Sequence, residues 1–199
     1  MRFLKYLKYR PYRTPEKSGK DGEAIVRYVL GKNIPQERYV LNNVIIENNG
    51  HSTQIDHILI DSRGIFVIET KNHGGRVYGS ESSLEWRQYL GRNSSPNKFY
   101  NPIIQNRQHI EALKNFYNER DLYISLIVFL DAEVHATAKS ASIVNILSLQ
   151  KIMETTTTPH LAPLEIEKIY HIFLEAIANC STTEEEHISN VKSKIVTKR

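Results

Sequence analysis

Hydrophobic and polar positions alternate most clearly over residues 54–71, QIDHILIDSRGIFVIETK. Alternation with a period of two is typical of β-strands, and the glycine-containing stretch at 61–64 is typical of a tight turn, so we expect an antiparallel hairpin. From Gly64 onward both faces of the second strand are apolar until Glu69. A strand that is apolar on both faces is typical of the buried centre of a sheet.

Ionic side chains enter this hairpin where its strands end. One face of the first strand would carry Gln54, Asp56, Ile58 and Ile60, and one face of the second would carry Ile65, Val67, Glu69 and Lys71. The turn would bring Asp56 across from Glu69. Two carboxylates and the Lys71 ammonium are therefore expected to converge.

Such a convergence indicates metal-assisted hydrolysis of phosphodiesters, because buried charges are costly unless they are paired or bind a metal. Carboxylate oxygens suit Mg²⁺ or Mn²⁺, and the ion would polarise a scissile phosphate and lower the pKa of a bound water. Lys71 would stabilise the developing negative charge or orient the water. The simpler alternative is that Glu69 and Lys71 form a solvated strand end and that Asp56 is an edge residue.

Upstream of the hairpin, the pattern predicts a helix over residues 23–30 that ends near Gly31, with Asp21 as its N-cap and a loop at 19–22. Glu23 would lie in the first turn, where the helix dipole by itself favours a carboxylate. A strand is predicted over 39–46.

Downstream, we expect a glycine turn at 72–75 and a polar, basic loop at 91–98, with Trp86 packed in the sheet. The longest helix is expected to start with Asn101 as N-cap and Pro102 in its first turn, which places Gln105 near the positive helix end. The remaining predicted elements are strands at 76–79, 84–89, 122–130 and 142–147, a small helix capped by Ser148 and ending at 154, and a helix at 164–178.

Length and composition point to one globular domain, with 199 residues of which 40% are hydrophobic and 24% charged. We expect a basic tail over 1–18, the domain over 19–180 and a polar tail over 181–199. The net charge of +4 permits nucleic-acid binding without requiring it. The single cysteine, Cys180, leaves no internal disulfide and fits a reducing cytoplasm.

No stretch is apolar over the roughly 18 residues that a membrane span needs. The basic, aromatic segment 1–13 has no secretory-signal pattern. Three interpretations stay open for it: a loose tail, an amphipathic membrane-surface anchor, or an arm that contacts nucleic acid.

Several short motifs follow one another in the first half of the chain: GKDGE at 19–23, QIDH at 54–57, GIFVIETKN at 64–72, Gly79, Trp86, and NPIIQN at 101–106. Each motif alone is weak, whereas the ordered set with its spacing is specific. Together, over residues 19–118, they resemble the nuclease-related domain, NERD, a branch of the restriction-endonuclease-like PD-(D/E)XK superfamily. The chain departs from the superfamily pattern at Ile55, where a proline would precede the aspartate; that proline is not a ligand.

The resemblance implies an α/β fold in which helices flank a central mixed sheet, with the active site at one edge of the hairpin. The residues that it implies for catalysis are Glu23, Asp56, Glu69, Lys71 and Gln105. By that similarity Asp56, Glu69 and the backbone carbonyl of Thr70 would bind Mg²⁺ or Mn²⁺, and Glu23 would reach the ion directly or through water. Lys71 would serve the water and the phosphate, and Gln105 would complete the site.

We therefore expect a divalent-metal-dependent nuclease that acts on DNA and leaves a 5′-phosphate and a 3′-hydroxyl, as is usual for relatives. The residues expected to contact nucleic acid are Asn72, Arg92 and Lys98. Expected partners are a second copy of the chain and a separately encoded helicase or kinase, because related domains occur joined to such modules. Two alternatives stay open: a nucleic-acid-binding module without catalysis, and a membrane-surface protein anchored by residues 1–13.

Overall fold

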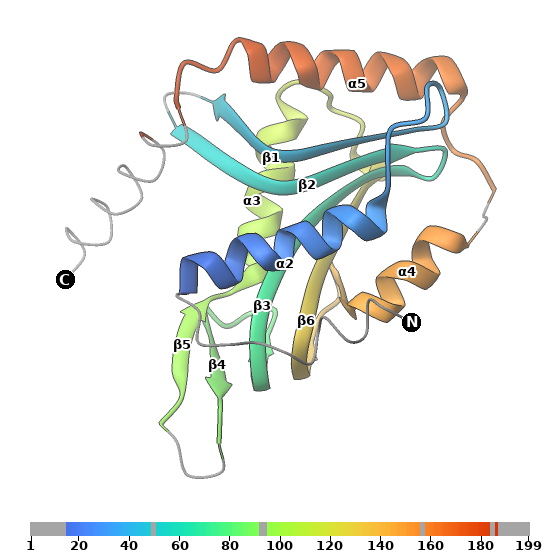
Figure 1. The fold of residues 1–199 in the computed structure, drawn as a ribbon. Coiled ribbons are helices and arrows are strands. Elements are labelled where there is room, and N and C mark those ends of the chain that lie inside the picture. Colours follow the sequence, from blue (N-terminus) through green and yellow to red (C-terminus); the bar gives the residue numbers. More distant parts are fainter. Residues whose placement is uncertain (1–14, 49–50, 92–94, 156–157, 184–185, 187–199) are drawn as a thin grey trace.

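The computed structural model describes residues 15–48, 51–91, 95–155, 158–183 and 186 (Figure 1). Within them, one seven-stranded sheet is flanked by helices. The strands are β1 (Arg38–Asn48), β2 (His51–Asp61), β3 (Gly64–Ser80), β4 (Glu85–Tyr89), β5 (Asn97–Tyr100), β6 (Tyr123–Thr137) and β7 (Ser142–Asn145). The helices are α2 (Pro15–Leu30), α3 (Pro102–Lys114), α4 (Ile146–Glu154) and α5 (Pro163–Ala178), with a single 3₁₀ turn at Arg120–Leu122.

The strand β3 is the axis of the sheet. The parallel strand β6 follows one edge of β3 over nearly its whole length, from Ile65 to Ser80. The other edge is shared, because β2 pairs antiparallel with β3 only as far as Ile68 and β4 pairs with it only from Arg76. Between these two partners, residues 69–75 of β3 have no neighbouring strand on that edge. The strands β1 and β5 extend the sheet outward from β2 and β4, and β7 pairs in parallel with β6.

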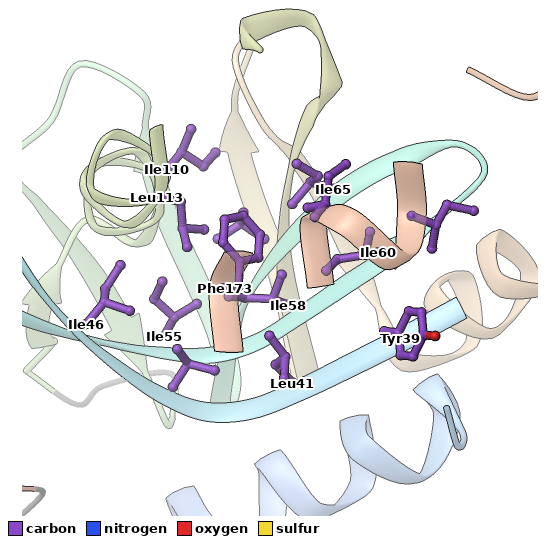
Figure 2. Close-up of a cluster of buried hydrophobic side chains, with 14 of the residues drawn as sticks. Tyr39, Leu41, Ile46, Ile55, Ile58, Ile60, Ile65, Ile110, Leu113 and Phe173 are labelled. Carbon is purple, nitrogen blue, oxygen red and sulfur yellow. The ribbon is translucent and has the colours of Figure 1, made fainter. Parts of the chain in front are cut away.

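Helices cover both faces of this sheet. On one face α2 and α4 pack against Leu59, Phe66 and Ile68. On the other face, α3 and α5 pack against a cluster in which Phe173 of α5 lies among side chains of β1, β2, β3 and α3 (Figure 2). The predicted buried hairpin with two apolar faces is thus confirmed, and the mixed sheet between helices has the expected restriction-endonuclease-like architecture. None of the described helices is long and apolar enough to cross a membrane.

The first described helix is longer than its pattern predicts. It begins at Pro15, so Asp21 lies inside the helix rather than at its N-cap, and residues 19–22 are helical rather than a loop. Proline suits the first turn of a helix, which explains the start. Gly22 is tolerated because α2 approaches β3 closely: a Cβ there would lie 3.0 Å from the Cβ of Asn72 and 2.9 Å from Cδ1 of Leu130.

The predicted glycine turn at 72–75 is also wrong, because β3 continues through it. The register to β6 changes from Lys71 opposite Phe129 to Gly74 opposite Asp131, so β3 holds one extra residue there. This β-bulge bends the strand without ending it. Gly75 has a φ of 70°, and a Cβ on it would lie 2.2 Å from the carbonyl oxygen of Tyr89. Pairing with β6 thus keeps a glycine-rich stretch extended.

The strands β1 and β2 change face midway. Leu41 and Val44 of β1, and Ile55 and Ile58 of β2, lie three residues apart, yet both members of each pair join the same cluster. An uninterrupted strand would point them to opposite faces. The change on β1 coincides with Asn43, whose φ of 52° lies in the left-handed region that asparagine tolerates. The prediction of one continuous face from Gln54 to Ile60 is therefore wrong.

The other boundaries differ less. Asn101 caps α3 as predicted, and its side chain accepts a hydrogen bond from the amide of Ile103, but at 13 residues α3 is shorter than the 16-residue α2 and α5. The cap of α4 is Asn145 rather than Ser148, because the Asn145 side chain accepts from the Ser148 amide. Trp86 is fully buried, which confirms its expected packing role. Residues 1–13, with their proposed anchor or arm, lie outside the described residues.

Candidate active site

The candidate site lies where β2 and β3 separate. His57 and Ile68 form the last pair of the β2–β3 ladder, so Asp56 and Glu69 come next on the two diverging strands. The amide of Thr70, on the edge of β3 that β2 leaves, donates a hydrogen bond of 2.7 Å to Oδ2 of Asp56. The Asp56 carboxylate thus replaces the missing strand partner and is held beside Glu69, as the hairpin pattern predicted.

Glu69 is held at both oxygens. The ammonium of Lys71 lies 2.6 Å from Oε1, and Nε2 of His109 lies 3.2 Å from Oε2. The Glu69 side chain is only 2% exposed, against 18% for Lys71. Burial alone would raise the pKa of Glu69, but the Lys71 ammonium and His109 together hold that pKa below its ordinary value. Glu69 is therefore an ionised carboxylate in the protein interior.

Gln105 joins this group from α3. Its Oε1 accepts a hydrogen bond of 3.1 Å from Nζ of Lys71, so the ammonium bridges a strand carboxylate and a helix amide. The neighbouring Asn106 fixes α3 to the sheet: its side-chain amide donates to the carbonyl of Val67 and to the hydroxyl of Ser125, both at 2.8 Å. These bonds fix the position of Gln105 relative to β3.

Three carboxylates act on one another electrostatically. Burial raises the pKa of Asp56 well above its ordinary value, and the nearby charges of Glu69 and Glu23 raise it further against the opposing Thr70 amide and Lys71. Burial likewise raises the pKa of Glu23; Lys20 and Arg27 oppose the rise and the Glu69 charge adds to it. The helix α2 thus brings Glu23 close enough to Glu69 for their charges to interact.

Asn43 is a neighbour of the site that the sequence did not indicate. Its side chain lies near Glu23 and works against the rise in the pKa of that carboxyl. This is the residue with left-handed backbone at the face change of β1. A backbone conformation that costs energy for most residues thus coincides with a contact to the third carboxylate.

His109 and Thr53 were also missed. Nδ1 of His109 lies 2.8 Å from the hydroxyl of Thr53, and its other ring nitrogen reaches Glu69. The signal available in the sequence was the spacing: His109 lies four residues after Gln105, and residues at that spacing share a helix face. Its partner Thr53 lies 56 residues away in sequence and only the fold brings it near.

Two histidines, His57 and His73, lie close to the site residues in the sequence and have contacts of their own. His57 is completely buried and its Nδ1 lies 2.7 Å from Oδ1 of Asn42. Burial, followed by the charge of Arg27, lowers the pKa of His57 to about 3, so this imidazole is neutral. The ring of His73 stacks on Phe99 with centroids 4.2 Å apart.

Two of the three residues expected to contact nucleic acid are described, and they lie on different strands, Asn72 on β3 and Lys98 on β5. Lys98 on β5 is 58% exposed and its ammonium lies 3.2 Å from a Glu85 oxygen. Asn72 is partly buried beside Gly22 of α2. Arg92 lies outside the described residues.

A family model described as the nuclease-related domain, NERD, matches residues 18–130. The chain belongs to the NERD family. This confirms the resemblance seen in the motifs. The matched range contains β2, β3, α3 and the part of α2 from residue 18 onward, which carry every residue of the candidate site. An uncharacterized protein of Bacillus anthracis is 36% identical over 185 residues, which cover 90% of this chain and 86% of the relative. The comparison with solved structures gave no significant match.

The NERD site offers oxygen ligands that suit a hard divalent cation, but its described side chains do not form a complete ligand set. In the described part of the chain, no group of three or more histidine, cysteine, aspartate or glutamate side chains is arranged to hold a metal ion. Both oxygens of Glu69 and one oxygen of Asp56 already accept hydrogen bonds. Burial, and after it the charges of Glu69 and Glu23, raises the pKa of Asp56, and a cation beside this carboxylate would offset both effects. Oxygen donors of this kind fit Mg²⁺ or Mn²⁺ rather than zinc.

Proposed function

We propose that this NERD protein is a divalent-metal-dependent nuclease that hydrolyses phosphodiester bonds in DNA. The single observation that carries the proposal is the convergence of Asp56, Glu69 and Lys71 at the point where β2 leaves β3. A protein that only bound nucleic acid would gain nothing from clustering buried acids beside phosphates, because like charges repel.

Each group has a distinct task in this proposal. Asp56 and Glu69, together with the carbonyl of Thr70, would hold Mg²⁺ or Mn²⁺, with Glu23 contributing directly or through water. A bound ion supplies charge neutralisation at the phosphate and a water of lowered pKa. The Lys71 ammonium, which Gln105 holds at 3.1 Å, places positive charge beside the acids, where it stabilises the charge that develops on the phosphate oxygens.

The bond between Lys71 and Glu69 has a consequence for metal binding. The Lys71 ammonium lies 2.6 Å from Oε1 of Glu69 and balances its charge. A cation at the same carboxylate would take over that balance and free the ammonium to turn toward the substrate.

The test is a cleavage assay on single-stranded, duplex and branched DNA with Mg²⁺, Mn²⁺ or EDTA. Wild type is compared with Glu69→Gln and with Glu111→Gln, a control at an exposed glutamate of α3 outside the site. We expect metal-dependent products from wild type and the control, and a loss of about 100-fold or more in Glu69→Gln. Equal cleavage by all three proteins would show a contaminating nuclease and remove the proposal.

A second candidate function is a non-catalytic nucleic-acid-binding module. The observation that favours it is the pairing of Lys71 with Glu69, which in a non-catalytic protein is simply a buried ion pair. It predicts binding with a steep salt dependence and no cleavage with any divalent ion. The same assay separates the two functions, provided that binding is measured by electrophoretic mobility shift in parallel.

A further inference from the structure

We infer that His109 and Thr53 form a hydrogen-bond relay that positions Glu69 for metal binding. The inference rests on the proposed function in one respect, namely that Glu69 is a metal ligand. The relay itself is read from side chains that lie on three different elements: Thr53 on β2, His109 on α3 and Glu69 on β3.

Hydrogen-bond chemistry sets the direction of the relay. An ionised carboxylate only accepts, so Nε2 of His109 must donate to Oε2 of Glu69. In a neutral imidazole the other ring nitrogen is then an acceptor, and it lies 2.8 Å from the hydroxyl of Thr53, which can donate to it. The order Thr53 O–H to Nδ1, then Nε2–H to Glu69, defines a single tautomer.

The relay controls an oxygen that no other described group contacts. Lys71 holds Oε1 of Glu69, and His109 holds Oε2 from the α3 side. With both bonds in place the carboxylate plane is fixed, because rotation about its terminal torsion would break one of them. His109 is itself 4% exposed, so solvent does not offer a replacement donor. Removing the ring would leave Oε2 buried and free to rotate.

Partners of this kind act on metal affinity through the ligand that they orient. Outer residues that hydrogen-bond a ligand typically change metal affinity or activity by about 10- to 100-fold when they are replaced. His109 is therefore a positioning residue, and Thr53 positions His109 in turn. Neither residue needs to touch the substrate.

The tautomer is tested in the metal-free protein by nitrogen NMR of the imidazole rings at about pH 8, where histidine is ordinarily neutral. The expected spectrum of His109 has the proton on Nε2. In Thr53→Val, which keeps the shape and removes the hydroxyl, the proton is expected to stay on Nε2, because Glu69 still requires a donor there, while the Nδ1 resonance is expected to shift because its hydrogen bond is lost. Thr53→Ser is expected to restore the wild-type Nδ1 resonance. A proton found on Nδ1 in wild type, or an Nδ1 resonance that Thr53→Val leaves unchanged, would overturn the relay.

The effect on the metal is tested by calorimetric titration of Mn²⁺ into the full chain without nucleic acid. Affinity is expected to fall about 10- to 100-fold in His109→Gln, less in Thr53→Val, and not at all in Thr53→Ser or in the control His171→Gln on the exposed side of α5. Circular dichroism shows whether each variant is folded. If His109→Gln does not fold, the Mn²⁺ affinity of Thr53→Val tests the relay in its place.

The two proposals fail in different ways. Wild type that binds Mn²⁺ and cleaves DNA, with unchanged affinity in both His109→Gln and Thr53→Val, removes the relay and leaves the nuclease standing. If wild type binds no Mn²⁺, the metal-dependent function and the role of the relay in it are both wrong. The NMR experiment still tests the hydrogen bonds of the relay.

Discussion

The amide of Thr70 donates to the carboxylate of Asp56 at the position where β2 stops pairing with β3. An amide that would otherwise pair with a neighbouring strand thereby positions a carboxylate. The bond also explains how Asp56 can remain beside Glu69 although burial and the charge of Glu69 both raise its pKa. The separation of β2 from β3 therefore frees the Thr70 amide, and that amide holds Asp56 beside Glu69.

Replacing Asp56 with asparagine is expected to abolish cleavage and to stabilise the metal-free fold. The asparagine oxygen can still accept from Thr70, while the repulsion between Asp56 and Glu69 disappears. Because the raised pKa means that the folded state disfavours the ionised form, the free energy of unfolding at pH 7 should rise by on the order of 1 kcal/mol. The gain should shrink toward acid pH, where wild-type Asp56 is protonated. Urea unfolding in EDTA at both pH values measures it, and a loss of stability at pH 7 would contradict this account.

Gln105 should matter through Lys71 rather than through the fold. In Gln105→Ala the ammonium loses an acceptor at 3.1 Å, and hydrogen bonds to charged groups are worth about 1.5–3 kcal/mol. We expect kcat for DNA cleavage to fall about 10- to 100-fold. Gln108→Ala, at an exposed position of the same helix, is the matched control and should cleave normally. A similar loss of kcat in both variants would mean that the substitutions act by disturbing α3 rather than through Lys71.

The pattern of the sequence identified the parts of this site that depend on local rules. Glu69 and Lys71 follow from the alternation in β3, and the tight turn that pairs Asp61 with Gly64 brings β2 alongside. The change of face in β2 next to Asp56 was not predicted. Gln105 followed from the family resemblance and from Asn101 as a cap. The hydrogen bonds of His109 and the effect of Asn43 on Glu23 could not be predicted, since the partners come from other elements of the chain.

The wrong predictions about the fold share a physical reason. Gly74 and Gly75 are typical of a turn, but parallel pairing with β6 holds them in a bulged strand. Gly22 lowers helix propensity, but its missing side chain is what allows α2 to approach Asn72. In both places a tertiary contact outweighs a local preference of about 1 kcal/mol.

Two glycines of α2 should respond oppositely to alanine. At Gly19 an added Cβ meets nothing within 4 Å, so Gly19→Ala should stabilise the protein by about 0.5–1 kcal/mol through helix propensity. At Gly22 the added Cβ meets Asn72 at 3.0 Å and buried Leu130 at 2.9 Å, so Gly22→Ala should cost about 1–3 kcal/mol. Thermal unfolding of the two variants measures the contrast. Since Glu23 follows Gly22, cleavage should also fall in Gly22→Ala only.

His57 should make the metal-free protein acid-sensitive. Its pKa is about 3 in the folded protein, against an ordinary value of 6.5, because of burial and the charge of Arg27. Between these values the unfolded chain binds the proton and the folded protein does not, so the free energy of unfolding falls as the pH falls from 6.5 toward 3. The slope is up to about 1.4 kcal/mol per pH unit, which amounts to about 2 kcal/mol between pH 7 and pH 5.

The measurement compares wild type with His57→Gln in urea at pH 7 and pH 5, with EDTA present. The glutamine can donate to Asn42 but does not titrate. His57→Gln should therefore become more stable relative to wild type as the pH falls. The carboxylates titrate in both proteins, and Asp56 contributes with the opposite sign, so only the difference is informative. A difference that stays constant with pH would mean that His57 is not held neutral.

Lys71→Met separates the structural and catalytic tasks of the ammonium. In the metal-free protein it leaves Glu69, 2% exposed, with His109 as its one remaining described partner, and breaking a buried pair typically costs about 3–5 kcal/mol. The control Lys114→Met removes an ammonium 2.7 Å from the exposed Glu111 and should cost less than about 1 kcal/mol.

Addition of Mn²⁺ should then raise the melting temperature of Lys71→Met by more than that of wild type, because the cation replaces the missing ammonium at Glu69. Cleavage should nevertheless stay lost, since the metal restores the charge balance of Glu69 but not the positive group beside the phosphate. Equal melting-temperature shifts in the two proteins would mean that Mn²⁺ and Lys71 do not share Glu69.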